Sequence, residues 1–241
     1  YGARRIIEKI EITVEPKNPE SSKSFSSSQL NTADRETVMN SILDACIFPL
    51  IRQRPFNKVA NPTDVPRDIF ISAYNTAPLS VNVSKIIQNN KDEFQAGLTA
   101  LSKLTEGSVY LSSQKPMEFD NVTNVTIEGP HPAGNVGIQI HHIKPINPGE
   151  VIWTVNAQHV ITIGKLFQNG QYDPGCIVSI GGSGSSNPQT VRALTGSSIE
   201  SLLKDQLLNG SQRIISGDVL TGKRVSLSLI HISEPTRHER L

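Results

Sequence analysis

The chain has 241 residues, 37% of them hydrophobic and 19% charged, a composition typical of a folded protein with an aliphatic core. Its 23 basic and 22 acidic residues nearly cancel, so we expect no nucleic-acid partner. The apolar stretch at 42–51 is interrupted by Asp44 and Pro49 and is too short to span a membrane, which takes about 20 apolar residues. Cys46 and Cys176 lack a metal-binding spacing, which favours buried, reduced thiols.

The N-terminal part of the chain is predicted to contain a strand and a linker. Residues 4–14 alternate Ile and Val with charged residues in their second half, the period-two pattern of a half-buried strand. Because the chain begins with Tyr1 beside this strand, we assign residues 1–15 to the end of a preceding domain. Residues 16–31 are rich in Ser, Pro, Lys and Asn, and this composition predicts a linker.

Residues 32–185 are predicted to form a Rossmann-like domain, because strand patterns alternate with helix patterns. Helix periodicity appears at 32–48, at 92–104 and in the second half of 151–167. Apolar or β-branched runs at 68–73, 107–112, 122–127 and 177–180 predict strands. This alternation indicates a mainly parallel, three-layer α/β sheet.

Residues 186–225 are predicted to be a second, incomplete unit. A strand at 190–194, a helix at 198–208 and a strand at 213–216 suggest a truncated β-grasp-like module. The Gly-Ser stretch at 181–187 lacks the third glycine of a dinucleotide-binding loop, so we interpret it as an interdomain hinge.

Residues 226–241 are interpreted as a non-native tail. Leu227 to Arg237 reads LSLIHISEPTR, which looks like a translated sequencing adapter. His231 and His238 are therefore excluded as functional candidates.

Two segments are candidates for ligand or partner contact. RQRPFNK places Arg52, Arg54 and Lys58 around Phe56, a combination that suits a planar, carbonyl-bearing ligand or an acidic partner, although it also suits a solvated loop. The segment EGPHPAG at 128–134 follows a predicted strand. It predicts a rigid turn that either directs His131 into a crevice or only reverses the chain.

Other histidines and known motifs give no catalytic site. His141 and His142 are interpreted as strand neighbours, whose side chains would point to opposite faces and could not share a metal ion. Hydrolase, zinc-protease and phosphate-loop motifs are absent from the sequence. We therefore expect no independent catalysis and no metal site.

Six segments occur in the same order as in one known family: GARR, RQRPFNKVANP, NTAPL, EGPHPAGNVG, IGKLFQNG and RIISGDVLTG. Over residues 2–223 the chain resembles the A subunit of the bacterial Na+-translocating NADH:quinone reductase. The resemblance implies a lipoyl-like region, then a Rossmann-like domain related to the flavoprotein subunit of respiratory complex I, then a soluble-ligand-binding β-grasp domain. Both ends of the family's length are expected to be missing.

The resemblance also implies a function. The family's complex passes electrons from NADH to ubiquinone and exports sodium, and its A subunit is peripheral on the cytoplasmic face of the bacterial inner membrane. Contact with the membrane is then expected only through partner subunits. If ubiquinone contacts this chain, the first candidates are Arg52, Arg54, Phe56 and Lys58, and the second is His131.

No redox cofactor is expected in this chain. In flavin-binding relatives the loop after the first helix is glycine-rich, whereas FPLIRQRPFNKV here has no glycine, and a cysteine cluster for an iron–sulfur centre is absent. NADH, FAD, FMN and iron–sulfur centres are expected in partner subunits. Two alternatives remain open: a flavin-binding subunit of an Rnf-type electron-transport complex, and a soluble binding protein with a nucleotide in its Rossmann-like crevice.

Overall fold

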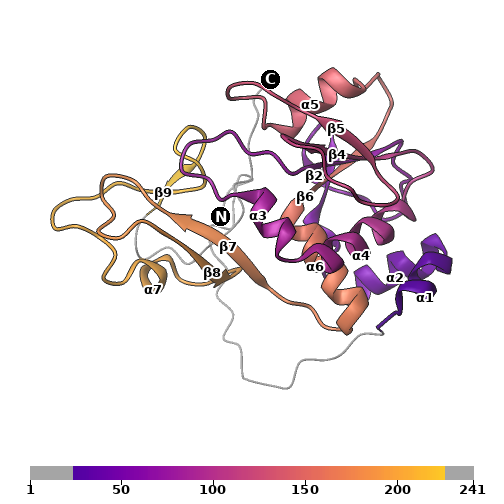
Figure 1. Ribbon diagram of the computed structural model, residues 1–241, viewed down its shortest axis with the longest axis horizontal. Coiled ribbons are helices and arrows are strands. Elements are labelled where there is room, and N and C mark those ends of the chain that lie inside the picture. The colour runs from indigo at the N-terminus through magenta and orange to yellow at the C-terminus, as the bar shows by residue number, and fades with distance from the viewer. Residues whose placement is uncertain (1–23, 226–241) are drawn as a thin grey trace, which may run out of the picture.

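The computed structural model describes residues 24–225, which form a six-stranded sheet with helices on both faces and a smaller unit beside it (Figure 1). The sheet order is β2-β1-β6-β3-β4-β5. The four strands from β6 to β5 are parallel, and β1 and β2 add an antiparallel pair at one edge. Their bounds are β1 (Ile51–Arg54), β2 (Lys58–Val59), β3 (Ile69–Ser72), β4 (Val109–Ser113), β5 (Thr123–Thr126) and β6 (Ile152–Asn156).

The helices divide unequally between the two faces of the sheet. The larger core joins α1, α2, α4 and α6 to one face, whereas a small core of Phe70, Ile140 and Ile152 lies under α5 on the other. Figure 1 accordingly shows α5 across the strands from α2, α4 and α6. The predicted α/β class with a parallel-rich sheet is confirmed. The helices are α1 (Ser27–Thr32), α2 (Arg35–Asp44), α3 (Val83–Gln88), α4 (Lys91–Ser102), α5 (Val136–Ile143) and α6 (Ala157–Asn169), with the 3-10 helix η1 (Phe48–Leu50) after α2.

The linker predicted for residues 16–31 is wrong in its last part. Phe25 and Leu30 are buried, and Phe25 packs on Phe167 at the end of α6 with 5.3 Å between ring centroids. The backbone N–H of Phe25 donates to the carbonyl of Phe167 at 2.6 Å. The polar average composition of the segment does not reveal that these two apolar residues are buried. One of its serines, Ser26, is the N-cap of α1. The predictions for residues 1–23 and 226–241 lie outside the described residues.

The smaller unit contains two antiparallel pairs of strands, β7 with β8 and β9 with β10. The strand predicted at 177–180 therefore does not belong to the Rossmann-like sheet, and the predicted boundary at residue 185 falls between two paired strands. Residues 181–187 connect β7 to β8, so the interpretation as an interdomain hinge is wrong. A short apolar run does not reveal its partner strand. The elements are β7 (Gly175–Ile180), β8 (Gln189–Leu194), α7 (Ile199–Leu203), β9 (Ile214–Ser216) and β10 (Lys223–Val225).

Helix α5 was also missed, and His141 and His142 lie on it rather than on a strand. Their rings meet edge to face with 5.4 Å between centroids. The sequence VGIQIHHI is rich in β-branched residues, which favour strands locally. Burial of Gln139 and Ile140 against the sheet outweighs that preference.

Helix α6 is capped at both ends and packs closely against α4. The Asn156 side chain caps its first turn by accepting from the Gln158 N–H at 2.8 Å, and Gly170 ends it with a left-handed φ of 67°. Where α6 crosses α4, two glycines bring the backbones together. A Cβ on Gly164 would overlap the carbonyl of Glu93, and a Cβ on Gly97 would overlap the carbonyl of Val160.

Gly164→Ala is expected to destabilise the fold by about 3 kcal/mol, because the added methyl group forces the two helices apart. For a chain of this size that lowers the melting temperature by about 6–12 °C, measurable by circular dichroism. Gly181→Ala is the matched control, since its Cβ would meet nothing closer than 3.8 Å. Equal melting temperatures for the two variants would show that the close helix approach is not required.

Candidate functional site

The basic segment is a β-hairpin rather than the predicted loop. Arg52 pairs with Val59, and Gln53 pairs with Lys58. Arg52 donates from Nη2 to the carbonyl of Asn57, which holds the turn closed. Phe56 at the turn is 78% exposed, whereas Arg54 is 7% exposed. The hairpin therefore presents Phe56 and Lys58 to solvent, whereas Arg52 is half-buried and Arg54 is buried.

The hairpin turn lies at the edge of the sheet where the parallel strands begin, which we call the amino edge. Strand β1 runs antiparallel to β6, and Arg54 pairs with Ile152, the first residue of β6. Ile51, at the other end of β1, pairs with Val155. The direction of β1 therefore carries the chain from the carboxyl edge to the amino edge before the turn.

His131 lies at the opposite, carboxyl edge of the sheet, in the loop between β5 and α5. Its Nδ1 is 3.1 Å from the hydroxyl of Thr76, in the loop after β3. The same hydroxyl accepts from the N–H of Gly134 at 3.0 Å, and a side chain at Gly134 would collide with the backbone of Thr76. The structure thus brings Arg52, Arg54, Phe56 and Lys58 into one hairpin but separates them from His131.

Gln139 is a buried polar residue of the carboxyl edge that the sequence analysis missed. It is 1% exposed, and its Nε2 donates to the Ser72 hydroxyl at 3.0 Å and to the Ala133 carbonyl at 3.1 Å. Ser72 in turn donates to the carbonyl of Tyr74 at 3.0 Å. These bonds fasten the loop before α5 to the end of β3. The contact could not be predicted without predicting α5, because Gln139 reaches Ser72 from that helix.

The segment after α2 is packed into the core. Ile47, Phe48 and Ile51 are buried, and Phe48 meets Trp153 edge to face with 5.8 Å between centroids. The N–H of Leu50 donates to the Ile47 carbonyl at 3.0 Å. The backbone of this segment therefore forms η1 and β1 and not an open loop.

A network of charged side chains supports the amino edge. Asp68, fully buried, accepts from Arg67 Nε at 2.7 Å, from Lys144 Nζ at 2.8 Å and from the Ser108 N–H at 3.1 Å. Arg67 also binds Glu150. Burial alone would raise the pKa of Asp68, but the hydrogen bonds from Lys144, Ser108 and Arg67 outweigh it and lower the pKa below 3.8. This network holds β3, β4 and the end of α5 together and has the character of a structural element.

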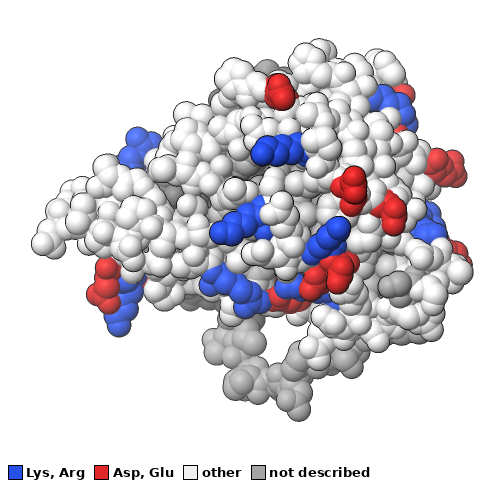
Figure 2. Space-filling model, in the orientation of Figure 1, with Lys and Arg blue, Asp and Glu red and all other residues white. Residues whose placement is uncertain are grey.

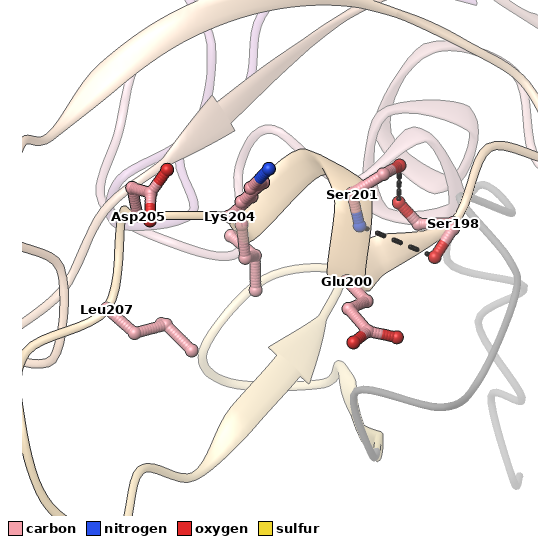
Figure 3. A pocket seen from close by; sticks show the side chains of 7 residues that line it. Ser198, Glu200, Ser201, Lys204, Asp205 and Leu207 are labelled. Carbon is pink, nitrogen blue, oxygen red and sulfur yellow. Dashed lines mark hydrogen bonds between the residues drawn. The ribbon is translucent and has the colours of Figure 1, made fainter.

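The smaller unit carries a shallow hollow of about 440 Å³ beside α7 (Figure 3). It contains none of the residues predicted to form a site. Ser198 caps α7 by accepting from the Ser201 N–H at 3.4 Å, and both signs of charge line the hollow. Its lining residues are Ser198, Glu200, Ser201, Leu203, Lys204, Asp205 and Leu207.

Residues 24–225 contain no group of three or more His, Cys, Asp or Glu residues that could hold a metal ion. Within the same residues, no helix combines the length and apolar character needed to cross a membrane. Acidic and basic side chains are interspersed over the face shown in Figure 2.

These features define a mixed α/β protein in which a parallel-rich sheet domain is followed by a small two-hairpin unit. A family model described as the NqrA second alpha/beta domain matches residues 33–172, and one described as the NQRA C-terminal domain matches residues 177–226. The chain belongs to the NqrA family, and the resemblance found in its sequence is confirmed.

Relatives of the chain are named as the A subunit of Na(+)-translocating NADH-quinone reductase. The one from Marinomonas sp. (strain MWYL1) is 35% identical over 226 residues, covering 92% of this chain and 51% of that protein. The one from Vibrio alginolyticus is 36% identical over 225 residues, covering 92% of this chain and 50% of that protein. The chain thus spans about half the length of these relatives.

Among solved structures, an NAD+-reducing NiFe hydrogenase in the H2-reduced state has a similar fold. Its TM-score is 0.52 at 11% identity, covering 75% of this chain and 40% of the hydrogenase chain. This likeness concerns the fold alone.

Asp68→Asn is expected to lower the free energy of unfolding by about 3 kcal/mol at pH 7, the lower end for a broken buried ion pair. The lower end applies because the side chain of Lys144 is 42% exposed and can turn to water. The lowered pKa also predicts that wild type loses stability as the pH falls below about 4, since the unfolded chain then binds the additional proton. The variant should show a shallower loss.

Urea denaturation at pH 7 and at about pH 3 measures both effects. Asp44→Asn, at an exposed position, is the control and should change stability by less than about 0.5 kcal/mol. An Asp68→Asn variant as stable as this control would contradict the structural role of the network.

Proposed function

We propose that the chain is part of a peripheral subunit of a Na+-translocating NADH:quinone reductase, supporting electron transfer to ubiquinone coupled to sodium export. The observation that carries the proposal is the ordered match of two NqrA family models across residues 33–226. The relatives' names supply the reaction, with identities of 35–36% over 92% of this chain. The other subunits of that complex are the proposed partners, and the cytoplasmic face of the bacterial inner membrane is the proposed location.

The proposal includes no redox cofactor bound to this chain. Its support is the packing of the segment after α2, where buried Phe48 and Ile51 occupy the place in the chain at which a flavin site needs glycine. NADH, FAD, FMN and iron–sulfur centres are then held by partner subunits, and this chain contributes shape and contacts rather than chemistry. Membrane contact is made through the same partners.

A direct contact with ubiquinone remains a prediction for Arg52, Arg54, Phe56, Lys58 and, separately, His131. A quinone ring is normally enclosed in a concave, mostly apolar pocket. Phe56 instead is 78% exposed at the hairpin turn, and His131 is hydrogen-bonded to Thr76. These observations favour protein contact over an enclosed ligand at the hairpin.

The smaller unit is proposed to be part of a β-grasp domain of the soluble-ligand-binding kind. Its support is a helix, α7, lying between two antiparallel strand pairs, together with the match to the NQRA C-terminal domain. The four strands form two separate two-stranded sheets.

Disruption of the gene that encodes this chain is expected to abolish Na+-stimulated NADH:ubiquinone reduction by membranes of the host bacterium. Restoring the gene on a plasmid should return that activity. The measurement is quinone reduction with and without added sodium in isolated membranes, and the control is succinate:quinone reduction, which should not change. Undiminished Na+-stimulated activity in the disrupted strain would overturn the proposed function.

The purified chain is expected not to bind FMN in stoichiometric amounts, because the backbone after α2 is bonded into η1 and β1. Titration of FMN with the chain, followed by the fluorescence of the flavin itself, measures this directly. The single tryptophan, Trp153, packs on Phe48 and provides a second signal for any change in that segment. Stoichiometric binding would favour the flavin-binding subunit of an Rnf-type complex.

A further inference from the structure

The tip of the β1–β2 hairpin, residues 55–59, is the most exposed apolar feature of the described part of the chain. Phe56 is 78% exposed, more than any other large hydrophobic residue in residues 24–225, and Val59 on β2 is 43% exposed. Exposing an aromatic ring to water is unfavourable, and exposed aromatic residues are enriched where proteins bind other proteins. A single exposed apolar residue does not by itself indicate a binding surface, so the inference also depends on the geometry and charge of the tip.

The tip is held in one conformation by its base. Ile51 is fully buried, Arg54 is 7% exposed, and Arg52 closes the turn by donating to the Asn57 carbonyl. Two cross-strand pairs continue the six-stranded sheet into the hairpin. An anchor that is already ordered loses little conformational entropy on binding, which favours its use as a recognition element.

The segment that carries the tip has charged residues of one sign. Residues 45–63 include Arg52, Arg54 and Lys58 and contain no acidic residue. Among these cations Lys58 is exposed, Arg52 is half-buried and Arg54 is buried. The tip thus combines an apolar anchor with a cationic flank.

We propose that this tip is a docking element that inserts Phe56 into an apolar recess with an acidic rim on another subunit of the reductase. The inference rests on the proposed function and names the surface through which this chain meets its partner. A membrane surface fits less well, because anionic lipid attraction needs a cluster of cations and Lys58 is the single fully exposed cation of the tip. A second copy of the chain fits less well, because two cationic tips repel each other.

The test uses the affinity-tagged chain, expressed in the gene-disrupted strain and recovered from detergent-solubilised membranes. The double variant Phe56→Ser, Lys58→Glu is expected to recover about tenfold less NADH dehydrogenase activity with the tag than wild type, as expected for loss of an aromatic anchor. The matched control is Leu79→Ser, Lys85→Glu, an exposed leucine and lysine far from the hairpin in sequence, and it should recover the wild-type amount. Lys58→Arg keeps the charge and should do the same.

Each outcome separates the inference from the proposed function. If wild type recovers no reductase, both fail. If wild type and the hairpin variant recover equal amounts, the docking inference fails while the proposed function stands. The melting temperature of the hairpin variant should equal that of wild type, because both substituted side chains are exposed. If the double variant folds poorly, the recovery of reductase is compared for wild type and the single variant Phe56→Ala.

Two further measurements test whether the tip binds a lipid surface or a second copy of the chain. Flotation of the chain with vesicles of phosphatidylglycerol and phosphatidylethanolamine should show no binding that depends on Phe56 and Lys58. Size-exclusion chromatography should show no hairpin-dependent dimer. Hairpin-dependent binding in either experiment would overturn the protein-partner inference in favour of a lipid surface or a second copy.

Discussion

The close approach of α6 to α4 is the constraint on which the rest of the fold depends. It is possible because Gly164 and Gly97 remove the side chains that would separate the two backbones. From that position α6 also contacts two other parts of the chain. Phe167 receives Phe25 at the start of the described residues, and Gln158 exchanges two hydrogen bonds with the backbone of Ile177 on β7. The sheet domain and the smaller unit are therefore connected through one helix.

Further ionic contacts reinforce this connection at the other end of α6. Asp173, just before β7, is bound by Lys165 of α6 at 2.9 Å and also by Arg192 of β8. Burial alone would raise the pKa of Asp173, but the hydrogen bonds from Lys165 and the Gly175 N–H outweigh it and lower the pKa. Helix α6 therefore contacts the smaller unit and the segment before it at two places, through Gln158 in its first turn and through Lys165 further along.

Local sequence pattern was sufficient to predict those elements whose sequence favours a single type of secondary structure. Strands β3, β4 and β5 and helix α4 have periodic or β-branched sequences that point to one structure, and the predicted segments agree with them within two residues. Helix α5 and the partner of β7 could not be predicted in this way. Both are decided by contacts with distant residues, such as Gln139 on Ser72 and Ile177 on Arg192.

The candidate site shows the same division. Its residue types were visible in the sequence, since Arg52, Arg54, Phe56 and Lys58 stand together in one segment. Their arrangement was not, because burial of Arg54 and exposure of Phe56 follow from the pairing of β1 with β6. His131 lies at the opposite edge of the sheet because it follows β5, which is parallel to β6, so the two sets of candidates do not form one site.

The segment after α2 links the proposed lack of a cofactor to the proposed docking element. Phe48 and Ile51 hold the segment after α2 in the core, so the chain continues as β1 instead of opening around a phosphate. The chain then reverses direction after β1, and this reversal is the hairpin turn that exposes Phe56. On the proposed function, the residues that leave no room for a flavin and those that meet a partner protein are therefore consecutive in the chain, because β1 leads directly from one set to the other.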